Sequence, residues 1–180
     1  IGITGQAGFV GTHLYNTLGL QPDVFERIPF EDNFYTDTGV LDEFIKKCDV
    51  VVHLAAVNRN PDQQVLYDTN IKLVQDLIHS FERTNKTPYV FFSSSIQEKL
   101  DNLYGKSKQE GRILLEKWAK ENNAHFTAMV IPNVFGPFCK PNYNSFVSTF
   151  AWKLINGETP QIINDSCVPL IYISSLCQFI

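Results

Sequence analysis

The sequence contains no apolar run of the ~18 residues that a membrane-spanning helix needs. The longest candidate, residues 50–57, is interrupted by His53 and has the length of a buried strand. The four cysteines form no Cys-x-x-Cys pair and have no zinc-ligand spacing with the histidines. We therefore predict no bound metal and no disulfide framework. We expect reduced thiols in a cytoplasmic protein, with Cys48 and Cys177 packed in its interior.

The sequence also lacks an excess of basic residues. Its net charge is −4 and its isoelectric point is near 5.5, which argues against nucleic acid or an anionic membrane as a partner. A hydrophobic content of 44% with 19% charged residues is typical of a globular protein. The length of 180 residues favours one domain, residues 1–180. The chain begins inside a predicted strand and stops inside a predicted helix, so we expect a fragment that lacks the extreme N-terminus and a C-terminal part.

What the sequence does contain is a glycine-rich segment near its start. Gly5, Gly8 and Gly11 follow a short apolar strand and open a helical pattern. Gly5 would permit the tight turn, Gly8 the close approach of a pyrophosphate, and Gly11 the packing of helix on sheet. The N–H groups of Phe9 and Val10 would then face the phosphates at the positive end of the helix. The spacing predicts a dinucleotide-binding loop, although an ordinary glycine-rich turn has the same composition.

Apolar runs alternate with helical patterns along the chain, which is typical of β-α-β units. We predict a Rossmann-type α/β fold, a doubly wound parallel sheet with helices on both faces. The predicted strands are residues 1–4, 24–27, 50–55, 89–93, 126–131 and 168–173. The predicted helices are residues 8–18, 40–47, 63–83, 102–121 and 145–156, with a further helix at the end of the chain. Residues 133–144 are predicted to form a long loop.

A tyrosine and a lysine, Tyr104 and Lys108, lie four residues apart on a predicted helix, one turn from each other on the same face. A phenol with a pKa near ~10 is a poor acid or base at neutral pH. A neighbouring ammonium lowers this pKa and lets the tyrosine exchange a proton with a carbonyl oxygen. A surface helix that happens to carry both residues is the alternative. Serines at the end of the preceding strand, residues 93–95, could hold that oxygen in place.

These motifs occur in the order found in the extended short-chain dehydrogenases/reductases, and the chain resembles that family. The matching segments are residues 4–11 (TGQAGFVG), 53–56 (HLAA), 93–95 (SSS), 104–108 (YGKSK) and 132–137 (PNVFGP). The resemblance implies that Ser95, Tyr104 and Lys108 are catalytic, with Lys108 activating the tyrosine and contacting a ribose. It also implies that Leu54, Ala55 and Ala56 line the cofactor groove, that the main chain near Pro132 touches the nicotinamide, and that Asn133 touches the substrate.

A narrower resemblance is to the capsular-polysaccharide UDP-sugar reductases, in residues 53–59 (HLAAVNR), 93–97 (SSSIQ), 101–105 (DNLYG) and 139–145 (CKPNYNS). Those enzymes reduce a UDP-linked 4-keto-6-deoxy-N-acetylhexosamine, and they carry a C-terminal cupin domain. The resemblance implies substrate contacts for a further set of residues. That set is Asn58, Arg59, Gln97, Lys140, Asn142 and Asn144. Arg59 and Lys140 could bind the diphosphate or could equally be solvated loop residues.

The reaction can be narrowed further. Sugar dehydratases of this superfamily place Asp-Glu after the catalytic hydroxyl residue, whereas Ile96 and Gln97 follow here and cannot act as acid or base. We therefore expect an enzyme of capsule or O-antigen sugar biosynthesis that reduces a UDP-sugar 4-ketone with NADPH. An NAD-dependent nucleotide-sugar epimerase and a non-catalytic dinucleotide sensor stay open. Arg27 could bind the 2′-phosphate of NADPH, but Glu26 beside it would suit NAD. Many relatives are homodimers, which the resemblance implies here as well.

Overall fold

The computed structural model describes residues 1–180. The strands are β1 (Gly2–Thr4), β2 (Val50–His53), β3 (Tyr89–Ser95), β4 (Phe126–Ile131), β5 (Asn133–Phe135) and β6 (Leu170–Tyr172). The α-helices are α1 (Phe9–Leu18), α2 (Thr38–Lys46), α3 (Gln63–Thr84), α4 (Leu103–Glu121), α5 (Phe146–Ile155) and α6 (Ile173–Phe179). Two 3₁₀ helices are η1 (Asp32–Thr36) and η2 (Ile96–Lys99). The chain divides into two compact units, Ile1–Val130 and Ile131–Ile180.

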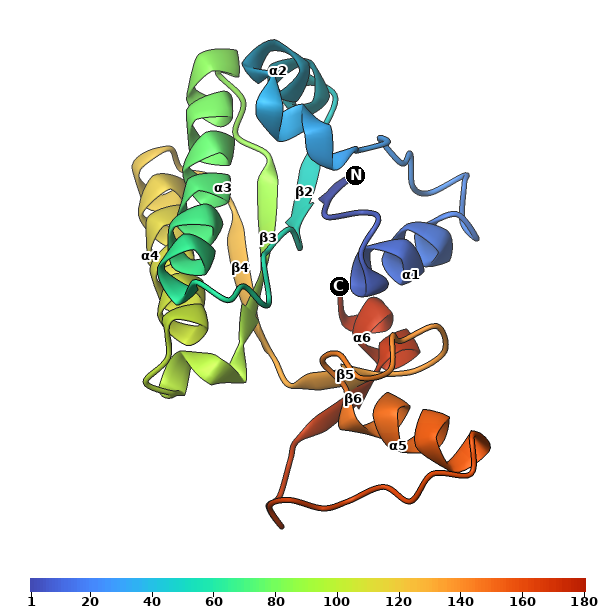
Figure 1. Ribbon diagram of the computed structural model, residues 1–180. Helices are drawn as coiled ribbons and strands as arrows, with labels where there is room; N and C mark the ends of the chain where they lie inside the picture. The colour runs from blue at the N-terminus through green and yellow to red at the C-terminus, as the bar shows by residue number, and fades with distance from the viewer. The chain divides into compact units, whose positions relative to one another are not determined.

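The first unit is built on a sheet with the strand order β1-β2-β3-β4. β1 pairs with β2 and β2 with β3, both in parallel, as the alternation of strands and helices predicted. Figure 1 shows α3 and α4 on one side of these strands and α1 on the other. The predicted Rossmann-type sheet with helices on both faces is therefore confirmed. Because the strands are parallel, their carboxyl ends lie at one edge, where the predicted site residues follow them.

The larger core of this unit lies between the sheet and the helices α2, α3 and α4. Val51 and Val90 project from neighbouring strands into it, and both side chains are fully buried. Phe81 of α3 packs on Trp118 of α4 with the ring centroids 4.6 Å apart. On the opposite face, Ile3 and Val52 are also buried, so the strands are covered on both sides. This explains why the strand sequences are continuously apolar.

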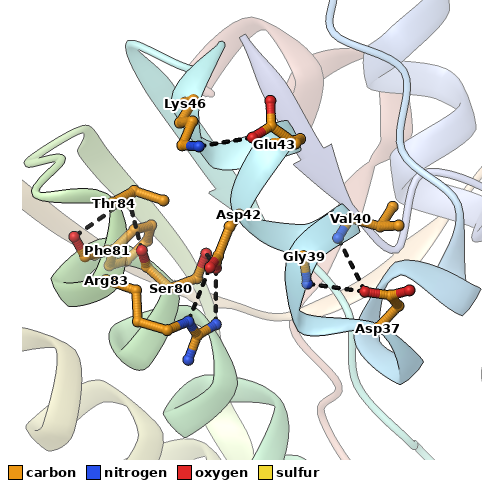
Figure 2. Close-up of polar contacts among 10 residues, drawn as sticks. All are labelled: Asp37, Gly39, Val40, Asp42, Glu43, Lys46, Ser80, Phe81, Arg83 and Thr84. Atoms are coloured by element: carbon orange, nitrogen blue, oxygen red, sulfur yellow. Dashed lines mark hydrogen bonds and ion pairs between the residues drawn. The ribbon is translucent and has the colours of Figure 1, made fainter.

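A polar cluster joins α2 to α3 at the edge of this core (Figure 2). The Asp42 carboxylate accepts hydrogen bonds from Arg83 Nε at 2.9 Å and Nη2 at 2.7 Å. It also accepts a bond from the Ser80 hydroxyl at 2.6 Å. At the start of α2, Asp37 accepts bonds from the N–H groups of Gly39 and Val40 and so caps the helix. The cluster fixes α2 against the long helix α3.

The second unit contains the parallel pair β5–β6 and the helices α5 and α6. Asn133 pairs with Leu170 and Phe135 with Tyr172. Phe135 and Tyr172 also contact each other, with ring centroids 5.5 Å apart.

Two expectations about local structure are wrong. Residues 24–27 form no strand, because only Ile28 bridges to Gly2 while the side chain of Arg27 turns to Tyr15. Residues 133–144 are not wholly a loop, because their first three residues form β5. The other predicted helices and strands are present within a few residues of their expected bounds.

Cys48 and Cys177 are buried, as expected. No helix is both long enough and apolar enough to cross a membrane.

Candidate active site

The glycine loop makes a turn that only glycine can make without strain. Gly5 has a φ of +69°, and a Cβ there would lie 2.8 Å from the backbone nitrogen of Ala55. A Cβ on Gly11 would lie 2.3 Å from the carbonyl oxygen of Gly5. Strand β1, the loop and α1 therefore pack against one another without room for side chains. The first and third glycines of the motif, Gly5 and Gly11, are therefore needed for the packing of the fold.

Gly8 has a different environment. It is the N-cap of α1, and its N–H donates to the carbonyl of Gly5 at 3.0 Å. A Cβ on Gly8 would meet only the carbonyl oxygen of Gly5, at 3.1 Å. No side chain caps α1, and its first turn, which includes Phe9 and Val10, carries no acidic residue. An uncapped helix start behind a side-chain-free loop fits the pyrophosphate of a dinucleotide.

The segment after β2 lies directly against this loop. The N–H of Leu54 donates to the carbonyl of Thr4 at 3.2 Å, and the backbone of Ala55 lies close to where a Cβ on Gly5 would be. Leu54, Ala55 and Ala56 are half-buried, so they form part of the wall beside the glycine loop. Asn58 and Arg59, the next predicted site residues, are exposed.

Ser95, Tyr104 and Lys108 lie at the carboxyl end of β3 and in the first turns of α4. The Lys108 ammonium donates to the carbonyl of Ser93 at 2.9 Å, and its nitrogen lies 5.9 Å from the centroid of the Tyr104 ring. Ser95 Oγ accepts a hydrogen bond from the N–H of Gln97 at 3.2 Å. Its own O–H hydrogen is therefore free to be donated to another acceptor. Lys108 and Ser95 are buried, whereas Tyr104 and Gln97 are half-buried.

Burial lowers the pKa of Lys108 to about 8, and the charge of Glu98 opposes this shift. His53, on the adjacent strand, is buried and accepts or donates a bond of 2.6 Å with Thr4 Oγ1. Burial and the nearby Lys108 charge lower the pKa of His53 to about 3, so this imidazole is neutral at physiological pH. Of this pair, Lys108 is therefore the one that carries a positive charge at neutral pH.

The segment between Ser95 and Tyr104 is packed tightly on α4. A Cβ on Gly105 would lie 1.9 Å from the carbonyl oxygen of Gln97, so only glycine fits after the tyrosine. Asn102 is the N-cap of α4, and its Oδ1 accepts from the N–H of Gly105 at 2.7 Å. These contacts fix the start of α4, and with it Tyr104, against the residues that follow Ser95.

Arg27, the predicted cofactor residue on the segment after α1, lies against Tyr15. Its guanidinium carbon is 4.3 Å from the centroid of the Tyr15 ring, and its Nη1 donates to the carbonyl of Tyr15 at 2.9 Å. A contact of Arg27 with a 2′-phosphate would have to use its other N–H groups.

The remaining predicted residues belong to the second unit. The Nδ2 of Asn133 donates to the carbonyl of Asn144 at 2.8 Å, while its Oδ1 is buried and has no hydrogen-bond partner. Pro132 is half-buried, and Lys140, Asn142 and Asn144 are exposed. Within this unit the structure brings Asn133 and Asn144 together.

Some residues that shape the site were missed by the sequence analysis. Asn70 of α3 is buried and accepts a bond from the N–H of Val57 at 2.7 Å while it donates to Ser107 Oγ at 3.0 Å. It thereby ties the segment after β2 to α4. The sequence did carry a signal for Asn70: an asparagine stands at a position of α3 where the helical pattern of buried residues is otherwise mostly apolar. Glu98 and Arg112 were also missed, since nothing in their spacing marks them as a pair.

Comparison with known families identifies the class. Residues 1–176 match the model of the NAD dependent epimerase/dehydratase family. The chain belongs to this family, whose members bind a nicotinamide dinucleotide. The resemblance predicted from the motifs is confirmed at this level. NAD and NADPH are not distinguished by the match.

The particular relatives are sugar-nucleotide and other reductases. The chain is 33% identical over 175 residues to the UDP-2-acetamido-2,6-beta-L-arabino-hexul-4-ose reductase of Pseudomonas aeruginosa, covering 97% of this chain and 46% of that protein. It is 26% identical over 173 residues to the dihydroflavonol 4-reductase of Callistephus chinensis, covering 79% of this chain and 47% of the relative. The chain thus spans about half the length of the curated relatives it matches.

Solved structures also resemble this chain in fold, and one of them is a capsule-related protein. The capsular polysaccharide assembling protein CapF from Staphylococcus aureus superposes with a TM-score of 0.76 at 31% identity, over 98% of this chain and 46% of CapF. The UDP-glucose 4-epimerase of Thermotoga maritima superposes with a TM-score of 0.85 at 20% identity, over 98% of this chain and 70% of the epimerase. The second likeness supports the fold alone, whereas the first supports the narrower resemblance to capsule-related proteins.

Proposed function

We propose that the protein reduces the 4-keto group of a UDP-linked 6-deoxy-N-acetylhexosamine with NADPH, in capsule or O-antigen sugar biosynthesis. The observation that carries the proposal is the buried Lys108 ammonium, one helical turn from Tyr104 and 5.9 Å from its ring centroid. The similarity to a UDP-sugar 4-ketone reductase over 97% of the chain supports the substrate class. The glycine loop and the uncapped start of α1 support the cofactor.

When bound, the nicotinamide supplies a hydride to the carbonyl carbon. The chain supplies the proton. The Tyr104 hydroxyl protonates the carbonyl oxygen, and the Lys108 ammonium stabilises the phenolate that remains. Lys108 is largely protonated at neutral pH because its pKa is about 8. The free O–H hydrogen of Ser95 donates to the same oxygen and holds it near the tyrosine.

The other predicted site residues complete the proposal. Gly5, Gly8, Gly11, Phe9, Val10, Leu54, Ala55, Ala56, Arg27 and Pro132 are assigned to cofactor binding, together with Tyr104 and Lys108. Asn58, Arg59, Gln97, Asn133, Lys140, Asn142 and Asn144 are assigned to the sugar nucleotide, together with Ser95. The unpartnered Oδ1 of Asn133 supports its assignment, because a buried acceptor gains most from a ligand donor. We also propose a cytoplasmic homodimer whose full chain carries a cupin domain.

The test is NADPH oxidation, followed at 340 nm, with freshly prepared UDP-4-keto-6-deoxy-N-acetylhexosamine. Tyr104→Phe should lower kcat by about 100-fold or more, because it removes the proton donor. The matched control is Tyr89→Phe. Tyr89 lies at the opposite end of β3, where its hydroxyl bonds Thr127 at 2.6 Å, so this variant should keep full activity.

Tyr104→Phe should still bind NADPH with an affinity within about twofold of wild type, since the glycine loop is unchanged. A variant that retains more than a tenth of the activity would refute the role of Tyr104. A wild-type protein that binds NADPH but does not oxidise it with the keto sugar would refute the reductase proposal. Epimerase assays with bound NAD would then come next, and a lack of turnover there would favour the dinucleotide sensor.

A further inference from the structure

An ion pair outside the predicted site residues braces the segment between Ser95 and Tyr104. Glu98 of η2 accepts hydrogen bonds from Arg112 of α4: Nη2 lies 2.9 Å from Oε2, and Nε lies 3.1 Å from Oε1. Glu98 also accepts a hydrogen bond from the Ser94 hydroxyl. The side chain of Glu98 is only 10% exposed and that of Arg112 is 29% exposed. The carboxylate is thus held by both elements that flank the segment, β3 and α4.

This clamp acts on a short piece of chain. The segment leaves β3 at Ser95, runs through η2 and enters α4 beside Tyr104. Gly105 already packs on the backbone of Gln97 at the other side of the same turn. Glu98 therefore adds a second anchor between η2 and α4, and a shift of η2 would move the residues on either side of it.

Glu98 also supplies charge. Lys108 is contacted by the carbonyl of Ser93 and the ring of Phe92 on β3, and by the ring of Tyr104 on α4. Two further titratable groups interact with its charge, neutral His53 on β2 and Glu98 on η2. Among these, Glu98 is the one anion. Burial would raise the pKa of Glu98, but the bonds from Arg112 and Ser94 and the charges of Arg112 and Lys108 hold it below its usual range. The carboxylate is therefore ionised at neutral pH.

We propose that Glu98, clamped by Arg112 and Ser94, is a positioning residue that orients the Ser95–Tyr104 segment and provides the counter-charge that keeps Lys108 an ammonium. This inference rests on the proposed function of the same site. It adds a residue that is neither in the glycine loop nor in the Ser-Tyr-Lys set. Its predicted signature is electrostatic, so it can be measured whether or not the sugar substrate is correct.

The experiment compares the purified protein with Glu98→Gln, Glu98→Asp and Glu116→Gln. The protonation of Lys108 is titrated against pH by NMR of protein labelled at lysine Cε, which gives the midpoint of its titration. The resonance is assigned with Lys108→Met. Glu116 is the matched control, because its carboxylate lies 3.8 Å from the same arginine but its side chain is 42% exposed and pairs with Lys120. In parallel, kcat for NADPH oxidation is measured from pH 6 to pH 10, and near-ultraviolet circular dichroism checks that each variant is folded.

Glu98→Gln should lower the Lys108 midpoint by about half a pH unit or more, because an opposite charge is removed from a poorly solvated site. The alkaline limb of kcat should move to lower pH by the same amount. Glu98→Asp should restore at least half of the shift, and Glu116→Gln should cause none. An unchanged Lys108 midpoint in folded Glu98→Gln, or an equal shift in Glu116→Gln, would overturn the inference. If no variant oxidises NADPH with the keto sugar, the proposed function fails while the Lys108 midpoints still decide the role of Glu98.

Discussion

Gly8 and Gly5 lie three residues apart in one loop, and their substitution by alanine should affect different properties. Gly5→Ala should mainly lower stability, and Gly8→Ala should mainly weaken cofactor binding. At Gly8 the new Cβ meets a single atom, the carbonyl oxygen of Gly5 at 3.1 Å. At Gly5 it meets the backbone of Ala55 at 2.8 Å and 2.9 Å, on a residue whose φ is +69°. The first change adds a methyl group at the open start of α1. The second change strains the fold.

The magnitudes follow from these contacts. Gly5→Ala should lower the free energy of unfolding by about 2–5 kcal/mol, the sum of ~1–2 for the left-handed backbone and ~1–3 for overpacking. Gly8→Ala should lower it by about 1 kcal/mol or less, since only the preference of an N-cap for glycine over alanine is lost. In contrast, Gly8→Ala should weaken NADPH binding by about tenfold or more, because the Cβ occupies the approach of the pyrophosphate.

Two assays on each variant measure these effects. Urea denaturation followed by circular dichroism gives the free energy of unfolding, and NADPH fluorescence gives the dissociation constant. Wild-type affinity in a normally folded Gly8→Ala protein would refute the assignment of this loop to the cofactor. An equal loss of stability in both variants would refute the distinction drawn from the contacts.

Three further predictions concern charge and packing. The rate of NADPH oxidation should fall as the pH rises through about 8, because Lys108 loses its proton there; a flat profile from pH 7 to pH 10 would contradict this assignment. Asp42→Asn should lower the free energy of unfolding by about 0.5–1 kcal/mol at pH 7, a small value because Arg83 is 41% exposed. Hydrogen bonds from Arg83 lower the pKa of Asp42, so its contribution is present above the unfolded pKa of ~3.9 and is lost as the pH falls through the folded value. Urea melts at pH 7 and pH 2.5 test this, and an equal cost at both would contradict it. Phe81→Ala should cost about 3–5 kcal/mol, since Phe81 is 1% exposed and packs on Trp118; a thermal melt within 2 °C of wild type would contradict it.

The sequence predicted those elements whose signal is local. Alternating apolar runs and helical patterns located the parallel sheet, and Gly19 and Asn122 stand where α1 and α4 end. Residues 24–27 were predicted as a strand because they are partly apolar. However, strand pairing depends on a distant partner, and only Ile28 finds one at Gly2. β5 was missed because three residues between Pro132 and Gly136 are too short to give a period.

The same limit applies to the site. The glycine spacing and the Tyr104–Lys108 pair have a fixed register within one turn, so the motif alone indicated them. Glu98 and Arg112 are 14 positions apart, and Asn70 and Ser107 are 37 apart. Such pairs are made by the packing of α3, α4 and η2, which no short motif encodes. The assignment of one domain to residues 1–180 and the roles of the individual site residues stay predictions.

The central claim, that this site transfers hydride to a sugar ketone, is tested most directly with deuterium. Wild-type protein is given NADPH labelled with deuterium at the transferable C4 position, together with the UDP-4-keto-6-deoxy-N-acetylhexosamine, and the product is analysed by NMR and mass spectrometry. We predict one deuterium at C4 of the product sugar for each NADPH oxidised. A product that forms without the label, as an epimerase returning the substrate's own hydride would give, would contradict the account.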